Sequence, residues 1–287
     1  MKRGEVRGNL WSIVLAGGDG VRTKEFTRHG LRSEIPGPYC AFVGSRSLFQ
    51  HTLDRAARLT PWDRVVVVAA RHHQQKVWPQ LDGRPVGRVL LPPKNVDTAA
   101  GIFLPLTYIL ARDPQATVVM YPSDYFLSEE GPVLSAMDHA VRGRSRLEGR
   151  WSIKPGQFLA RTGKAAIQAM ETCFEHPEEA SAHETRSTGS LWNTMVLAAT
   201  GEELWGLGWQ CFPEMMSHFE RLKEVIDTAE EPMVLGAIYE ALLRRNISSP
   251  LLHFTTERLP GRIVDTLDKT GKPMTCAEEP LPFLYQG

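Results

Sequence analysis

The N-terminal half of the chain alternates short apolar runs with segments of helical periodicity, and this alternation constrains the fold more than any other feature. The apolar runs lie at 11–16, 64–70, 86–91 and 116–121, and the helical segments lie at 47–59 and 98–111. Apolar runs without polar alternation are typical of parallel strands that are buried on both faces. Strands joined by helices predict an α/β fold with a doubly wound, mainly parallel sheet and right-handed crossovers.

The second half gives weaker signals. We expect a loop over 143–156, a helix over 163–173, a strand over 191–199 and helices over 201–222 and 231–245. Beyond Asn246 the proline and glycine content rises and the periodicity fades. These patterns predict one α/β domain over 1–245, with 246–287 as a C-terminal extension that is packed on the domain or completes it.

Charge and cysteine content exclude several classes of protein. The 287 residues carry 33 basic and 33 acidic side chains, and this balance argues against a nucleic-acid partner. The four cysteines lack the spacing of a zinc site or a disulfide framework. The first ten residues are too polar for a signal peptide, and no apolar run approaches the ~18 residues of a membrane span. We therefore expect a cytoplasmic protein without a membrane partner.

A glycine-rich segment follows the first apolar run directly and has the sequence LAGGDGVR, from Leu15 to Arg22. Successive backbone N–H groups in such a segment form an anion-binding nest, and an arginine adds a bidentate contact to phosphate oxygens. No Gly-Lys-Ser/Thr follows, so this is not a Walker A loop. The alternative is an ordinary turn after a strand. The candidate nucleotide-binding residues here are Leu15, Ala16, Gly17, Gly18, Asp19 and Gly20.

Five segments occur in the order seen in one enzyme family. They are Gly17 to Arg22, Asn95 to Ala99, Pro122 to Tyr125 (PSDY), Glu175 to Pro177 (EHP) and Leu191 to Thr194 (LWNT). Together they resemble the GGxGxR, ENRGTAP, PSDH, EKP and WNxG motifs of sugar-nucleotide pyrophosphorylases, and most of all mannose-1-phosphate guanylyltransferases. The resemblance implies a Rossmann-like, GT-A-like nucleotidyltransferase fold with a mixed, mainly parallel sheet.

The resemblance implies transfer of GMP from GTP to mannose-1-phosphate, which gives GDP-mannose and pyrophosphate. Arg22, Lys24 and Asp124 are then the catalytic candidates, and the implied cofactor is Mg²⁺. Asp124 matches the metal-binding aspartate of the family, and Asp265 is the only counterpart of its second metal ligand. Mg²⁺ suits such a site because it takes one or two carboxylates together with phosphate oxygens. The alternative for both aspartates is an ordinary role in a turn.

The remaining motifs imply the nucleoside and sugar contacts. Asn95, Thr98 and Ala99 would lie near the nucleobase or ribose, although Thr98 is equally a candidate for capping a helix. A tryptophan on an apolar strand such as Trp192 is also a common core residue. The candidate sugar-binding residues are Glu175, Trp192, Asn193 and Lys154.

Several departures from the family pattern fall on positions that carry charge. Gly37 and His176 stand where the family has lysines, and Lys154 stands where it has a glutamate. Losing one well-placed donor to a developing charge typically costs ~10²–10³ in rate. Two further hypotheses therefore remain: a non-catalytic relative that binds a nucleotide or nucleotide sugar as a sensor or partner subunit, and an unrelated α/β phosphate-binding enzyme. The oligomeric state is also open, a homodimer included.

Overall fold

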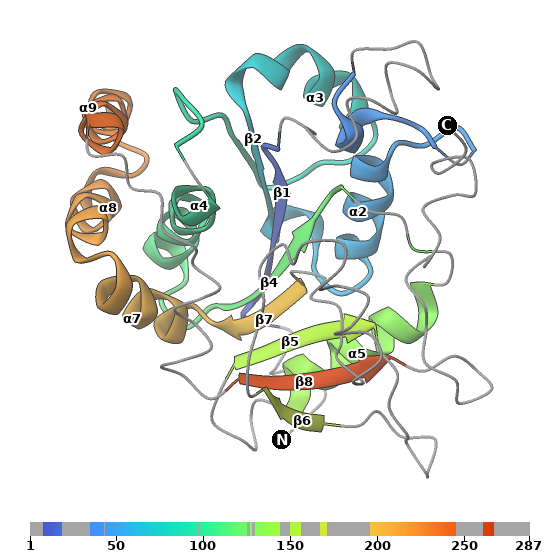
Figure 1. Cartoon of the computed structure of the whole chain (residues 1–287). Coiled ribbons are helices and arrows are strands. Elements are labelled where there is room, and N and C mark those ends of the chain that lie inside the picture. Colours follow the sequence, from blue (N-terminus) through green and yellow to red (C-terminus); the bar gives the residue numbers. More distant parts are fainter. Residues whose placement is uncertain are drawn as a thin grey trace, which may run out of the picture.

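Eight strands form one sheet in the computed structural model, in the order β3-β2-β1-β4-β7-β5-β8-β6 (Figure 1). The structure describes a set of separate stretches that together hold this sheet and its helices. They are residues 8–18, 35–42, 44–96, 98–124, 127, 130–143, 150–155, 167–170, 196–244 and 261–266.

The first four strands of this order are parallel. β1 (Leu10–Ala16) lies between β2 (Val65–Ala69) and β4 (Thr117–Pro122), and β3 (Arg88–Leu90) pairs with β2 at the edge. All five residues of β2 are buried, as a continuous valine run predicts for a strand with both faces covered.

The other four strands pair in mixed directions. β7 (Val196–Thr200) is antiparallel to β4 and to β5 (Arg150–Pro155). β8 (Gly261–Thr266) is parallel to β5, and β6 (Ile167–Met170) is antiparallel to β8. The expected α/β class with a mixed, mainly parallel sheet is confirmed. The division at residue 245 stays a prediction, and β8 from the proposed extension lies inside the sheet.

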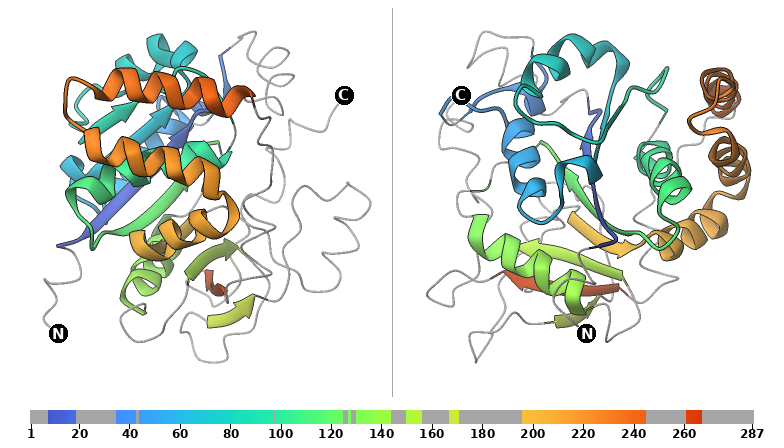
Figure 2. Two further views of the ribbon diagram at one scale, coloured as in Figure 1. Left: turned by 90° about the vertical axis from the view of Figure 1, so that its left-hand side faces the viewer. Right: turned by 180° about the vertical axis from the view of Figure 1, so that it is seen from behind.

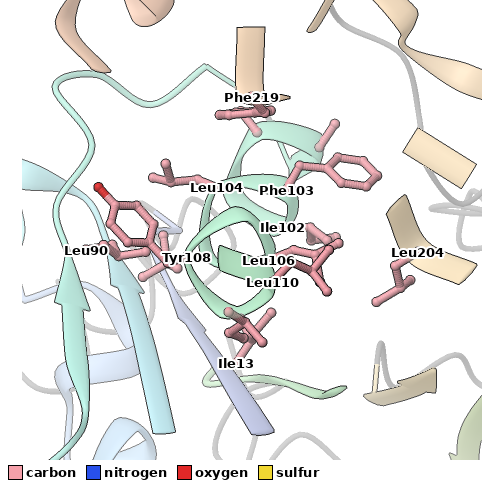
Figure 3. Packing of buried hydrophobic residues seen from close by; sticks show 14 of the residues in the cluster. Ile13, Leu90, Ile102, Phe103, Leu104, Leu106, Tyr108, Leu110, Leu204 and Phe219 are labelled. Carbon is pink, nitrogen blue, oxygen red and sulfur yellow. The ribbon is translucent and has the colours of Figure 1, made fainter. Parts of the chain in front are cut away.

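Helices cover both faces of the sheet (Figures 1 and 2). Each face of the sheet has its own hydrophobic core cluster beneath these helices. Successive side chains of a strand point to opposite faces, so Ile13 lies in one cluster and Val14 in the other. Figure 3 shows Ile13 beside the buried side chains of α4. One face carries α2 (Leu48–Ala57) and α5 (Glu130–Gly143), and the other carries α4 (Thr98–Arg112), α7 (Gly201–Cys211), α8 (Pro213–Val225) and α9 (Glu231–Arg244).

Short helical turns complete the described elements. The 3₁₀ turn η1 (Gly37–Tyr39) lies before α2, while η2 (Trp62–Arg64) leads into β2. η3 (Arg71–His73) runs into the helix α3 (Gln74–Gln80). In the part of the chain that the structure describes, no helix combines the length and the apolar character needed to cross a bilayer.

Two expectations for the second half are wrong, and a third is refined. Residues 150–155 form β5 where we expect a loop, and residues 167–170 form β6 where we expect a helix. The helical segment over 201–222 is two helices, because Pro213 begins α8 directly after α7 ends. Each of the two misassigned strands pairs with β8, which lies about a hundred residues further along the chain. Such pairing leaves no local signal in the sequence.

Candidate functional site

The candidate nucleotide and metal segments meet at the carboxyl edge of the parallel strands. Gly17 and Gly18 follow β1, and Ser123 and Asp124 follow β4. These two strands are neighbours, with Leu15 in register with Pro122, so the segments leave the sheet side by side (Figure 1). In open α/β sheets, ligands bind beyond this end of the strands.

Hydrogen bonds join the two segments to each other and to the segment before α4. The backbone N–H and the Oγ of Ser123 both donate to the Leu15 carbonyl, at 3.1 and 2.7 Å. The Asn95 side-chain amide donates to the Gly17 carbonyl at 3.4 Å. Asn95 and Ser123 therefore each bond to the segment that begins at Leu15, from 78 and 108 residues further along the chain.

Gly17 and Gly18 have room for a side chain in the folded protein. A Cβ at Gly18 would meet no atom within 4 Å, and one at Gly17 would meet only the backbone nitrogen of Ala70, at 3.7 Å. Positive φ occurs at two of the described glycines, Gly44 and Gly83, and not at Gly17 or Gly18. Packing and backbone angle therefore do not demand glycine here, which leaves close approach of a ligand as a physical reason for it.

Asp124 is exposed at the start of the segment after β4. The described residues contain no cluster of three or more histidine, cysteine, aspartate or glutamate side chains that would form a metal cage. A lone carboxylate beside a phosphate-binding segment still fits Mg²⁺, which takes the rest of its ligands from phosphate and water. Asp124 thus suits a metal that arrives with a nucleotide.

The other described candidates divide between the two halves of the sheet. Ala16 and Ala99 are buried, with exposed fractions of 1%, so neither residue presents an open surface to a ligand. Thr98 begins α4. Lys154 and Asp265 are register partners on β5 and β8, which places the proposed sugar ligand and the proposed second metal ligand at one level of the sheet.

Seven candidates lie outside the described residues, and their roles stay predictions. They are Asp19, Gly20, Arg22, Lys24, Glu175, Trp192 and Asn193. His176, which replaces a family lysine, lies outside them as well.

Sequence reasoning missed Tyr39. Its hydroxyl donates to the Ala16 carbonyl at 2.7 Å, at the last residue of β1. Burial raises the pKa of the Tyr39 hydroxyl, which keeps it a proton donor at neutral pH. The only signal in the sequence is its place two residues after Gly37, which stands where the family has a lysine. Gly37 is buried in η1 beside it.

The curated relatives are distant and longer than this chain. No family model matches. Two proteins described as "Alginate biosynthesis protein AlgA", from Pseudomonas fluorescens and Pseudomonas putida, are each 24% identical over 196 residues, which is 63% of this chain. The chain spans about two fifths of the length of these relatives, 40% and 39%.

Two solved structures share the fold. A structure named as mannose-1-phosphate geranyltransferase from Thermus thermophilus matches with a TM-score of 0.71 and 23% identity, over 89% of this chain and 73% of its own. The predicted Rossmann-like fold is therefore confirmed. A structure named as mannose-6-phosphate isomerase from Helicobacter pylori matches with a TM-score of 0.64 and 15% identity, over 91% of this chain and 98% of its own. The predicted resemblance to sugar-nucleotide pyrophosphorylases is confirmed, and at these identities the likeness establishes the fold.

Proposed function

We propose that the chain is a sugar-1-phosphate nucleotidylyltransferase that makes GDP-mannose from GTP and mannose-1-phosphate. A phosphate oxygen of the sugar phosphate attacks the α-phosphorus of GTP. The bond between the α-phosphorus and the bridging oxygen to the β-phosphate breaks, and pyrophosphate leaves. Little covalent chemistry falls to the protein in such a transfer, so catalysis rests on positioning and on neutralising negative charge.

One observation carries the proposal: the glycine segment after β1, the Ser123–Asp124 segment after β4 and Asn95 meet at the carboxyl edge of the sheet. Backbone N–H groups beside an exposed carboxylate suit a triphosphate that carries Mg²⁺. The bound metal would neutralise phosphate charge, and Asp124 is its proposed ligand on this edge. Asp265 is the proposed second ligand.

The remaining roles follow the family motifs. Arg22 and Lys24 would hold the triphosphate, and Asn95 and Thr98 would lie at the nucleoside. The sugar phosphate would contact Glu175, Trp192, Asn193 and Lys154. Mannose is the proposed sugar because the two structures reported above bear the names of enzymes of mannose phosphates.

The test is pyrophosphate release by the purified chain, with Mg²⁺, one sugar-1-phosphate and one nucleoside triphosphate at a time. We expect the greatest release from GTP with mannose-1-phosphate, and none when EDTA removes the metal. Pyrophosphate release from another pair of substrates would change the substrate assignment and still support the reaction type. No release from any pair would reject the activity.

Gly37 favours a second candidate, a relative that binds a nucleotide or nucleotide sugar without turnover. Its position is buried and carries no charge where the family has a lysine. A neutral residue there supplies no donor to a transferring phosphate. Binding of GTP or GDP-mannose in calorimetry, without pyrophosphate release, would favour this candidate.

A further inference from the structure

We propose that Tyr39 is a positioning residue that fixes the backbone where the glycine segment leaves β1. The inference rests on the proposed function, because it assigns this fixed backbone to the binding of a nucleotide. Nothing in the family-like motifs assigns such a role to the tyrosine.

Three consecutive carbonyl groups at the end of β1 each accept a hydrogen bond from a distant side chain. Ser123 Oγ donates to Leu15, Tyr39 Oη donates to Ala16, and Asn95 Nδ2 donates to Gly17. The donors come from three separate segments, which follow β4, form η1 and precede α4. The chain is therefore held at three successive points just before Gly18.

Tyr39 is itself held firmly. Its ring packs edge-on against Phe49 of α2 and against His73 of η3, with centroid distances of 5.6 and 5.3 Å. Its carbonyl accepts a hydrogen bond from the Gln80 side chain at 3.0 Å. A donor whose ring and backbone are both fixed delivers its hydroxyl to one place, so Tyr39 transmits the position of α2 and α3 to the end of β1.

Bulk water cannot replace this donor at the Ala16 carbonyl. Ala16 is 1% exposed and Tyr39 is 3% exposed, so bulk water does not reach the pair. A buried carbonyl that loses its partner keeps its desolvation penalty, and the local backbone relaxes to escape it. Backbone N–H groups that bind phosphate act through their fixed position, so relaxation at residue 16 would weaken a contact made a few residues later.

The test compares Tyr39→Phe with Thr107→Val. Thr107 is fully buried in α4 and donates from its hydroxyl to the Phe103 carbonyl at 2.7 Å, the same bond type and length as at Tyr39. Both variants delete one buried hydroxyl and keep the shape of the side chain. Hydrogen exchange of the peptide over 15–20 reports local order without ligand, and calorimetry reports affinity for GTP with Mg²⁺.

We expect Tyr39→Phe to speed exchange of this peptide and to weaken GTP binding, each by about threefold to tenfold, the range for one lost hydrogen bond. Thr107→Val should change neither. Ser123→Ala, which removes the Oγ bond to Leu15 and keeps the backbone bond, should act in the same direction as Tyr39→Phe.

Unchanged exchange of the 15–20 peptide in Tyr39→Phe would overturn the positioning role. So would an equal loss of GTP affinity in Thr107→Val, because the effect would then follow from stability alone. A parent protein that binds no nucleotide would reject the proposed function instead, and the exchange comparison would still decide whether Tyr39 holds the segment.

Discussion

The two halves of the sheet differ in how the chain builds them and in what they offer a substrate. β3, β2, β1 and β4 are parallel, come from the first 122 residues and have helices on both faces. β7, β5, β8 and β6 pair in mixed directions, and β8 enters from beyond residue 260. The parallel half brings its candidate residues into hydrogen-bonding contact, whereas Lys154 and Asp265 are brought together only as register partners.

This difference suggests that the two halves of the sheet bind different substrates. The carboxyl edge of the parallel half has the glycine segment, Asp124 and the residues that hold them, which fits a nucleotide with its metal. The mixed half contributes Lys154 and Asp265, which we propose for the sugar phosphate and the second metal position. A variant in one half should therefore change one substrate more than the other.

The largest effect should come from the ion pair that joins the helices over the two halves. Arg55 of α2 is fully buried and lies 3.2 Å from Glu130 of α5, whose side chain is 19% exposed. α2 packs on β1 and β4, while α5 packs on β5, β7 and β8. Glu130→Gln should lower the free energy of unfolding by about 3 kcal/mol, because it removes a negative charge that faces a buried guanidinium.

Chemical denaturation measures this loss. The matched control is Glu240→Gln, which removes the carboxylate of the exposed Lys94–Glu240 pair and should change stability by less than about 1 kcal/mol. Equal losses in the two variants would mean that the Arg55–Glu130 pair stabilises the fold no more than an exposed ion pair does.

Asp124→Asn should reduce Mg²⁺-dependent turnover by about 10²-fold, since it removes charge from the proposed metal ligand. The side chain is exposed, and asparagine replaces aspartate well in a turn. We therefore expect an unchanged melting temperature. A Mg²⁺ titration of pyrophosphate release that matches the parent would assign Asp124 to the turn alone.

Gly18→Val should weaken GTP binding by at least about tenfold, because a branched side chain blocks close approach of phosphate to the backbone. A Cβ at Gly18 meets no protein atom within 4 Å, so the fold should tolerate it. The control is Gly206→Val on α7, which is also exposed and also has open space around its Cβ. Affinity for mannose-1-phosphate should change little in either variant, and an equal loss of GTP affinity in both would contradict the phosphate-binding role.

The smallest effect should come from restoring one family lysine at position 176. His176→Lys should raise kcat/KM several-fold, because a lysine ammonium group is charged at neutral pH and can meet the charge that develops on phosphate. The gain should shrink with added salt. No gain, or a gain that salt leaves unchanged, would show that charge at this position does not limit the reaction.

The sequence predicted the parallel half well because its strands are continuous apolar runs. The valine run of β2 and the strand β1 before the glycines are readable without any knowledge of their partners. β5, β6 and β8 each depend on a partner far along the chain. Local periodicity therefore misassigned the segments at 150–155 and 167–170.

The site follows the same rule. Glycine segments and the PSD motif have recognisable chemistry, so the sequence alone suggests Gly17, Gly18 and Asp124 as binding residues. Their binding roles stay predictions. Tyr39 was missed because its role consists of one hydrogen bond to a carbonyl 23 residues away. No spacing rule marks such a contact.

The most direct measurement is a hydrogen-exchange footprint of GTP with Mg²⁺ on the unmodified chain. The account predicts protection of peptides that cover residues 15–20 and 121–127, and little change in α8 and α9. Protection elsewhere, with none at these two segments, would contradict the assignment of the nucleotide site to the carboxyl edge of the parallel strands.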